Sequence, residues 1–154
     1  MAELVSQPTV IQSLYGMYRD GKIFVNRKYQ RKLVLTLEEK QRLVESIIRK
    51  YPIPAVLVAE SVEKPGVYEV IDGLQRLNAI FSYIENFYPD IEGRYFDVTK
   101  FSTAAGYAEA KLFSPKTAED KLPLKEVSTI LDYPLGSGLV KSHPEDDGCS
   151  DAYA

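Results

Sequence analysis

Apolar positions recur with a helical period in three segments of the chain, which predicts three amphipathic helices. The first is predicted near residues 8–20 with Gly21 as its C-cap. The second is predicted over 37–50, between a capping box of Thr36 and Glu39 and the helix-stopping Pro52. The third begins at residue 74 and is ended by Pro89. The buried stripes comprise Val10, Ile11, Leu14, Tyr15 and Tyr18; Leu43, Val44, Ile47 and Ile48; and Leu74, Leu77, Ile80, Phe81, Ile84, Phe87 and Tyr88.

Short β-rich runs lie between these helices. Ile23 and Val25 alternate with polar neighbours as in a short strand, whereas the basic NRKYQRK of residues 26–32 is typical of an exposed loop. AVLVAE and GVYEVI, joined by a turn at Pro65 and Gly66, predict an adjacent strand pair. Further on, RYFDV favours a strand, LPLKEVSTIL a helix and DYPLGSG a turn.

These elements predict one α+β or α/β domain over residues 1–141, with a small mixed sheet packed with helices. The length of 154 residues and the apolar share of 45% are ordinary for one soluble core. Residues 142–154 are acidic and small, which predicts a disordered tail.

Charge and composition narrow the possible chemistry. The formal net charge is -3, so there is no global basic field for nucleic acid and any phosphate binding must be local. One cysteine, Cys149, and one histidine, His143, allow neither a disulfide framework nor a Cys/His zinc site within the chain. No basic leader or membrane-length apolar run occurs, which favours a cytoplasmic protein without membrane contact.

A strand-to-helix turn carries the main candidate chemistry. Asp72 can cap the third helix together with Gln75, and Gly73 suits a tight turn, so a purely structural interpretation explains all three residues. Arg76 fits that interpretation less well, because a cation in the first turn opposes the helix dipole by about 0.3–1 kcal/mol. A docked anion would instead gain from free N–H groups, the dipole and the guanidinium. The structural alternative is a salt bridge, for example to Glu69.

Two motifs in order, Tyr-Gln-Arg at 29–31 and Asp-Gly-Leu-Gln-Arg at 72–76, resemble the N-terminal domain of GmrSD-type restriction endonucleases. These are modification-dependent, type IV enzymes of prokaryotes, and the domain is related to the ParB/sulfiredoxin fold. The resemblance is best over residues 8–90. The family writes the second motif Asp-Gly-Gln-Gln-Arg, so Leu74 departs from it. Gly73 and Arg76 also resemble the Gly-x-x-Arg phosphate box of ParB and sulfiredoxin.

The resemblance implies nucleotide handling in anti-phage defence. Members of the family bind, and in some cases hydrolyse, nucleoside triphosphates with a divalent metal, gating a separate His-Asn-His nuclease domain. Carried onto this chain, nucleotide or phosphate contacts fall on Tyr29, Gln30, Arg31, Gly73 and Arg76.

The resemblance also implies a Mg²⁺ ligand and catalytic positions. Asp72 would hold the metal or orient water, and Gln75 would position water or a phosphate oxygen. The departure at Leu74 bears on hydrolysis more than on binding. The resemblance thus implies a Mg-dependent NTPase as the candidate enzyme activity.

A chain with one histidine in its tail cannot form the His-Asn-His site. We therefore expect a sensor domain that lacks the nuclease, either isolated, truncated or one subunit of a two-chain system. The expected partners are a nucleoside triphosphate and a nuclease chain or DNA, with a homo-oligomer also open.

The sequence argues against two other classes of protein and leaves two more open. A sulfiredoxin-like reductase needs a cysteine where Gln75 stands, and the P-loop motif is absent. A ParB-like DNA-binding module could use the basic residues 27–32, although such a run is usually a solvated face. A non-enzymatic protein-interaction module also fits, because no complete catalytic set is visible.

Overall fold

The computed structural model describes residues 3–6, 9–25, 34–117, 120–135 and 138–141. Helices and short strands are mixed along the chain, so the predicted α+β class is confirmed. The elements are β1 (Glu3–Ser6), α1 (Ile11–Arg19), β2 (Ile23–Val25), α2 (Leu37–Ile48), β3 (Leu57–Glu60), β4 (Tyr68–Asp72), α3 (Leu74–Ile84), the 3-10 helix η2 (Val98–Lys100), α4 (Ser102–Glu109), α5 (Leu124–Leu131) and β5 (Gly138–Lys141).

The described residues form two compact units. The sheet unit comprises described residues within 1–33, 54–74 and 134–154, and the helical unit those within 34–53 and 75–133. The predicted single domain over 1–141 stays a prediction, because compactness alone does not show whether either unit folds independently.

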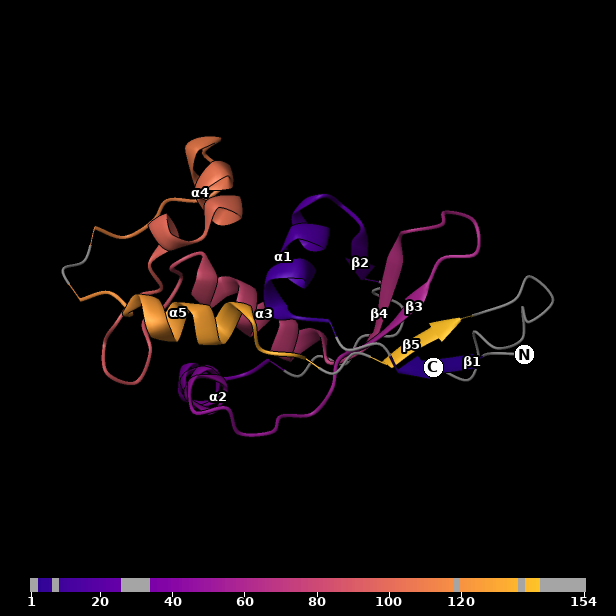
Figure 1. Ribbon diagram of the computed structural model, residues 1–154, viewed down its shortest axis with the longest axis horizontal. Helices are drawn as coiled ribbons and strands as arrows, with labels where there is room; N and C mark the ends of the chain where they lie inside the picture. The colour runs from indigo at the N-terminus through magenta and orange to yellow at the C-terminus, as the bar shows by residue number, and fades with distance from the viewer. Residues whose placement is uncertain (1–2, 7–8, 26–33, 118–119, 136–137, 142–154) are drawn as a thin grey trace. The chain divides into compact units, whose positions relative to one another are not determined.

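The sheet unit holds a mixed five-stranded sheet in the order β1-β5-β3-β4-β2 (Figure 1). The predicted β3–β4 pair is confirmed and is antiparallel, whereas β4 pairs with β2, and β3 with β5, in parallel. The connection of β3 to β4 closes with a turn in which the N–H of Val67 donates to the Lys64 carbonyl at 3.1 Å. Gly66 has φ 85° there, as the position after proline in a type II turn requires.

Helix α1 supplies much of the apolar core of the sheet unit. Ile11, Leu14 and Tyr15 are buried, and the helix contacts β2. Its end matches the predicted glycine stop: Gly21 has φ 72°, and the N–H of Lys22 donates to the Met17 carbonyl at 2.8 Å. This is a Schellman ending, which satisfies carbonyls that the helix leaves unpaired.

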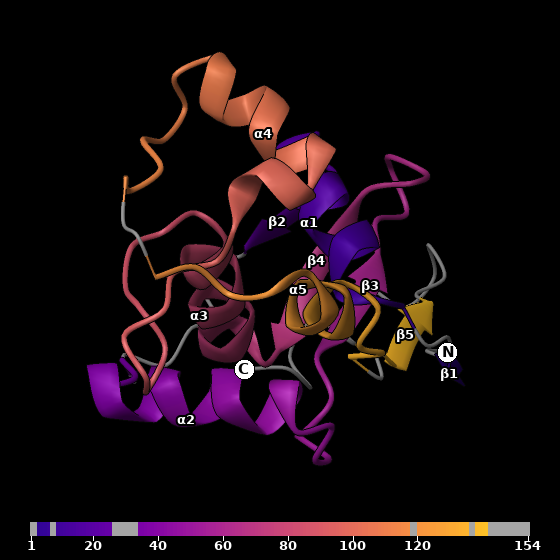
Figure 2. The ribbon, with the colours of Figure 1, turned by 60° about the vertical axis from the view of Figure 1, so that its left-hand side comes forward.

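In the helical unit, α2, α3 and α5 lie side by side in both views, and α4 stands apart from α2 (Figures 1 and 2). The capping box predicted for α2 is confirmed: the Glu39 N–H donates to Thr36 Oγ1 at 3.1 Å, and the Thr36 N–H donates to Glu39 Oε1 at 3.0 Å. Val44 and Ile47 bury the inner face of α2. These contacts explain why α2 begins where the sequence predicts.

Helix α3 ends four residues before the predicted end at residue 88, and this part of the prediction is wrong. Asn86 takes a left-handed φ of 66°, and the N–H of Phe87 donates to the Ser82 carbonyl at 2.9 Å, so the turn closes before Pro89. Phe87 is 69% exposed, contrary to the predicted stripe, whereas Tyr88 is buried outside the helix. Asparagine tolerates this backbone conformation better than most residues.

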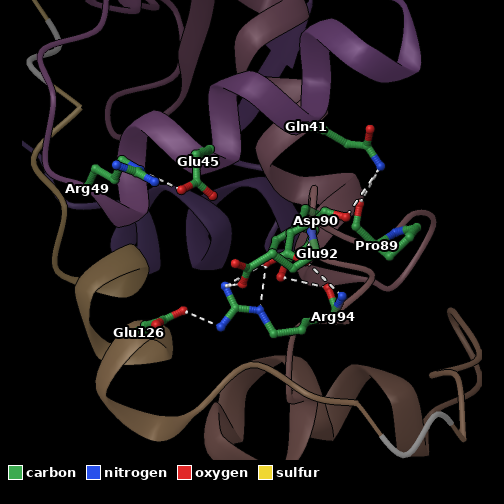
Figure 3. Close-up of polar contacts among 9 residues, drawn as sticks. Gln41, Glu45, Arg49, Pro89, Asp90, Glu92, Arg94 and Glu126 are labelled. Atoms are coloured by element: carbon green, nitrogen blue, oxygen red, sulfur yellow. Dashed lines mark hydrogen bonds and ion pairs between the residues drawn. The ribbon is translucent and has the colours of Figure 1, made fainter.

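A buried ion pair fixes the loop after α3 to α5 (Figure 3). The Asp90 side chain is fully buried and lies 2.9 Å from an Arg94 guanidinium nitrogen. The same guanidinium reaches Glu92 and, from α5, Glu126, each at 3.0 Å. Gln41 of α2 donates to the Pro89 carbonyl at 3.2 Å, so the loop is also held to α2.

The C-terminal predictions are mixed. The helix over LPLKEVSTIL is confirmed as α5, but the strand over RYFDV is wrong: Tyr95 makes one isolated bridge with Lys121, and η2 begins at Val98. The apolar residues Phe96 and Val98 alternate with polar neighbours because both are buried in the helical unit, and not because this segment pairs with another strand. Helix α4 and strands β1 and β5 were not predicted. The predicted loop at 26–32 and tail at 142–154 lie outside the described residues.

Candidate phosphate-binding turn

The end of β4 is irregular at the point where the predicted site begins. Leu57 pairs with Asp72 but Val58 pairs with Val70, so Ile71 is an extra residue in β4. Such a bulge bends its strand and changes where the following side chains point. Asp72 is the last residue of β4 and is exposed, which leaves its carboxylate accessible to solvent.

Gly73 forms the whole connection between β4 and α3. Its φ of 92° lies in the region that side-chain-bearing residues avoid, so glycine is required for this turn. Helix α3 begins at Leu74, and the residue before the helix is therefore Gly73, one position later than the predicted cap at Asp72. Among the described residues, no hydrogen bond joins the Asp72 side chain to Gln75. The turn differs in this respect from the capping box of α2.

Gln75 and Arg76 occupy the second and third positions of α3. Both are half-buried, whereas Leu77 and Ile80 are buried, which confirms that Gln75 and Arg76 lie off the apolar stripe. Arg76 also takes part in an interaction within the chain. The cation thus stands in the first helical turn, where N–H groups are not used by the helix itself.

The second half of the predicted site lies outside the described residues. Tyr29, Gln30 and Arg31 fall in the segment 26–33. Their role as a second phosphate arm or as a base-stacking surface stays a prediction.

The carboxylates that the structure describes can hold a divalent metal only if a bound phosphate ligand and water supply the other coordinating oxygens. Within the described ranges, no group of three or more His, Cys, Asp or Glu side chains is placed to hold a metal ion. Mg²⁺ is commonly bound through one or two carboxylates plus phosphate oxygens and water. Asp72 is exposed at the end of β4, so its carboxylate can supply one metal ligand while phosphate oxygens and water supply the others.

Sequence reasoning missed the buried Asp90–Arg94 pair. The signal was present in the segment Asp90-Ile-Glu-Gly-Arg94, where an aspartate followed by a glycine and an arginine favours a side-chain-capped turn. The Asp90 carboxylate accepts the N–H of Glu92 at 3.0 Å and that of Arg94 at 2.7 Å. These contacts are structural, and none involves the turn at residues 72–76.

The fold and the turn together define an α+β domain with Asp-Gly-Leu-Gln-Arg between a strand and a helix. Residues 11–134 match the family described as GmrSD restriction endonuclease, N-terminal domain, and the chain therefore belongs to that family. Its membership associates the chain with restriction systems. The match extends beyond the resemblance predicted over residues 8–90.

No curated protein and no solved structure matches the chain. The finer likeness to the ParB/sulfiredoxin fold therefore stays a prediction. Within the described residues, no helix is long and apolar enough to cross a membrane.

Proposed function

We propose that this chain is a nucleoside-triphosphate-binding sensor domain of a cytoplasmic anti-phage restriction system. The observation that carries the proposal is the position of Arg76 in the first turn of α3. This helix begins directly after Gly73, which has a φ of 92°. Family membership over residues 11–134 supports the restriction context. A helix N-terminus with a guanidinium beside it favours a phosphate over other ligands.

The residues of the turn would divide the work of holding the phosphates. The Gly73 amide and Arg76 would contact one phosphate, and Arg31 a second. Two guanidinium groups can neutralise a polyphosphate on a chain whose net charge is -3. Tyr29 would stack on the base and Gln30 would contact the nucleotide, as the family motif implies.

Asp72 and Gln75 are the residues proposed for catalysis. Mg²⁺, when bound, would supply positive charge at the phosphate oxygens. Asp72 would hold that ion or orient a water molecule, and Gln75 would position the water that attacks the γ-phosphoryl group. The products of that reaction are the nucleoside diphosphate and inorganic phosphate. Because Leu74 stands where the family has glutamine, we propose binding as the main activity and hydrolysis as slow.

Isothermal titration calorimetry with ATP, GTP, UTP and CTP, each with Mg²⁺, tests the proposal. We expect saturable binding of at least one nucleotide and a loss of about 10- to 150-fold in affinity in Arg76→Ala, because a hydrogen bond to a charged group contributes about 1.5–3 kcal/mol. Arg42→Ala is the matched control, since Arg42 is an exposed arginine that pairs with Glu38 on α2. Circular dichroism checks that both variants are folded.

Further variants test the second phosphate contact and the metal ligand independently. Arg31→Ala should weaken binding in the same way, and Asp72→Asn should reduce the dependence on Mg²⁺ while leaving metal-free binding unchanged. Tight binding retained in Arg76→Ala would contradict the proposed site. No binding of any nucleotide would leave residues 72–76 as a structural turn and favour a protein-interaction or DNA-binding module.

A binding signal would also justify a search for a partner. The family context makes a nuclease chain, with DNA as its substrate, the proposed partner of the sensor. Size-exclusion chromatography with light scattering, with and without nucleotide, would reveal a homo-oligomer.

A further inference from the structure

A small cavity lies in the helical unit, away from residues 72–76 in the sequence. Its volume is about 200 Å³, and the surface that lines it is mainly apolar. Phe96 and Val98 come from the segment around η2, and Ala105 and Ala108 from α4. Engineered apolar cavities of about 150 Å³ can hold a benzene ring, so the volume suits one aromatic ring.

The cavity is braced by a buried amide. Asn86 lines it and is 3% exposed. Its Nδ2 donates to the Phe96 carbonyl at 2.9 Å, and its Oδ1 accepts the N–H of Lys116 at 3.0 Å. One side chain thus ties two lining segments together, and it does so from the left-handed position that ends α3. A cavity held in this way is formed before a ligand arrives, which lowers the cost of binding.

The charged residues of the lining favour an anion. Lys116 and Lys121 both line the cavity and are exposed, whereas Glu109 is the single acidic residue among the lining residues that the structure describes. The formal charge of this described part of the lining is therefore positive. An apolar floor with cations at its edge is complementary to a ring that carries a negative group.

We propose that this cavity binds an aromatic ring bearing a phosphate or carboxylate group. The ring lies over Phe96, Ala105 and Ala108, and the anionic group faces Lys116 and Lys121. The site shares no residue with the proposed nucleotide turn, so each can be present without the other.

Phenyl phosphate is the probe for a ¹H–¹⁵N NMR titration of the full chain. A ligand of this size has a Kd on the order of millimolar at about 0.3 kcal/mol per non-hydrogen atom, so titration to roughly 20 mM is sufficient. We expect saturable shifts of the amides of Asn86, Phe96 and Ala108. Phenol supplies the ring without charge, inorganic phosphate the charge without the ring, and phenylacetate a carboxylate in place of the phosphate.

Two variants test the two parts of the site. Ala108→Leu fills the cavity and should abolish the saturable shifts, whereas Lys116→Glu should weaken binding by at least about two- to fivefold, the range expected when an exposed charge pair is lost. Lys125→Glu is the matched control: this lysine is exposed on α5 and does not line the cavity. Unfolding temperatures show whether each variant keeps its fold.

Several results would overturn the proposal. These are the absence of saturable shifts with phenyl phosphate, equal shifts with inorganic phosphate alone, and unchanged binding in folded Ala108→Leu. Equal weakening by Lys125→Glu would show a general effect of surface charge. Binding of phenol as tight as that of phenyl phosphate would remove the anionic part of the proposal.

Discussion

Replacement of Asp90 by asparagine should destabilise the helical unit strongly although the side-chain volume hardly changes. One carboxylate oxygen accepts two backbone N–H groups, and the other accepts Arg94 Nε–H at 3.0 Å and lies 2.9 Å from a second guanidinium nitrogen. Asparagine can keep the oxygen that accepts the two backbone N–H groups, but its NH₂ group then faces the Arg94 guanidinium, which is also a donor. The side chain is 0% exposed, so water cannot restore the lost contacts.

The magnitude follows from what remains around Arg94. Loss of one partner of a buried ion pair costs about 3–5 kcal/mol. Because Arg94 is 21% exposed and Glu92 and Glu126 still neutralise its guanidinium, we expect a cost at the lower end, about 3 kcal/mol. For a chain of this size that lowers the unfolding temperature by about 6–12 °C. Urea denaturation followed by circular dichroism measures the change in the free energy of unfolding.

Glu92→Gln is the matched control for Asp90→Asn. Glu92 contacts the same guanidinium nitrogen at 3.0 Å but is 66% exposed. An exposed pair contributes about 0–1 kcal/mol, so this variant should unfold close to the wild type. The reasoning from burial would be refuted if Asp90→Asn changed the stability by less than about 0.5 kcal/mol, or if both variants cost the same.

Three further changes test other parts of the fold. Thr36→Ala removes the hydroxyl that accepts the Glu39 N–H, one of the two capping-box contacts of α2, and should cost about 1 kcal/mol in urea denaturation, whereas Thr36→Ser should restore most of it. Gly73→Ala places a side chain at φ 92° and should cost about 1–3 kcal/mol; an unchanged midpoint would argue against this backbone conformation. Burial raises the pKa of the Tyr88 hydroxyl and, with the Asp90 charge as a second cause, that of Tyr83. A tyrosine whose pKa is raised in the folded state stabilises the fold at every pH below its unfolded pKa of about 10. This stabilisation is lost as the pH rises above that value toward the folded pKa. Tyr88→Phe should therefore flatten the alkaline fall in stability measured by urea midpoints above about pH 10, and an unchanged slope would contradict the assignment.

Local signals account for what the sequence determined by itself. The capping box of Thr36 and Glu39, the Gly21 ending of α1 and the Pro-Gly turn before β4 each act within a few residues, so their outcome does not depend on the rest of the chain. The candidate turn belongs to the same class. Asp72, Gly73 and Arg76 are consecutive or nearly so, and a strand followed at once by a helix fixes their positions along the backbone.

Pairings between distant segments decided the remainder. Strand β5 is a strand because it lies between β1 and β3, about 135 and 80 residues away in the chain respectively, and no local pattern encodes those partners. The end of α3 depends on Asn86, whose side chain bonds Phe96 and Lys116. Asp90 and Glu126 become one ion network only when α5 packs beside the loop after α3. Burial and long-range contacts of this kind are properties of the assembled tertiary structure, which is why the sequence alone could locate the candidate turn but not the braced cavity.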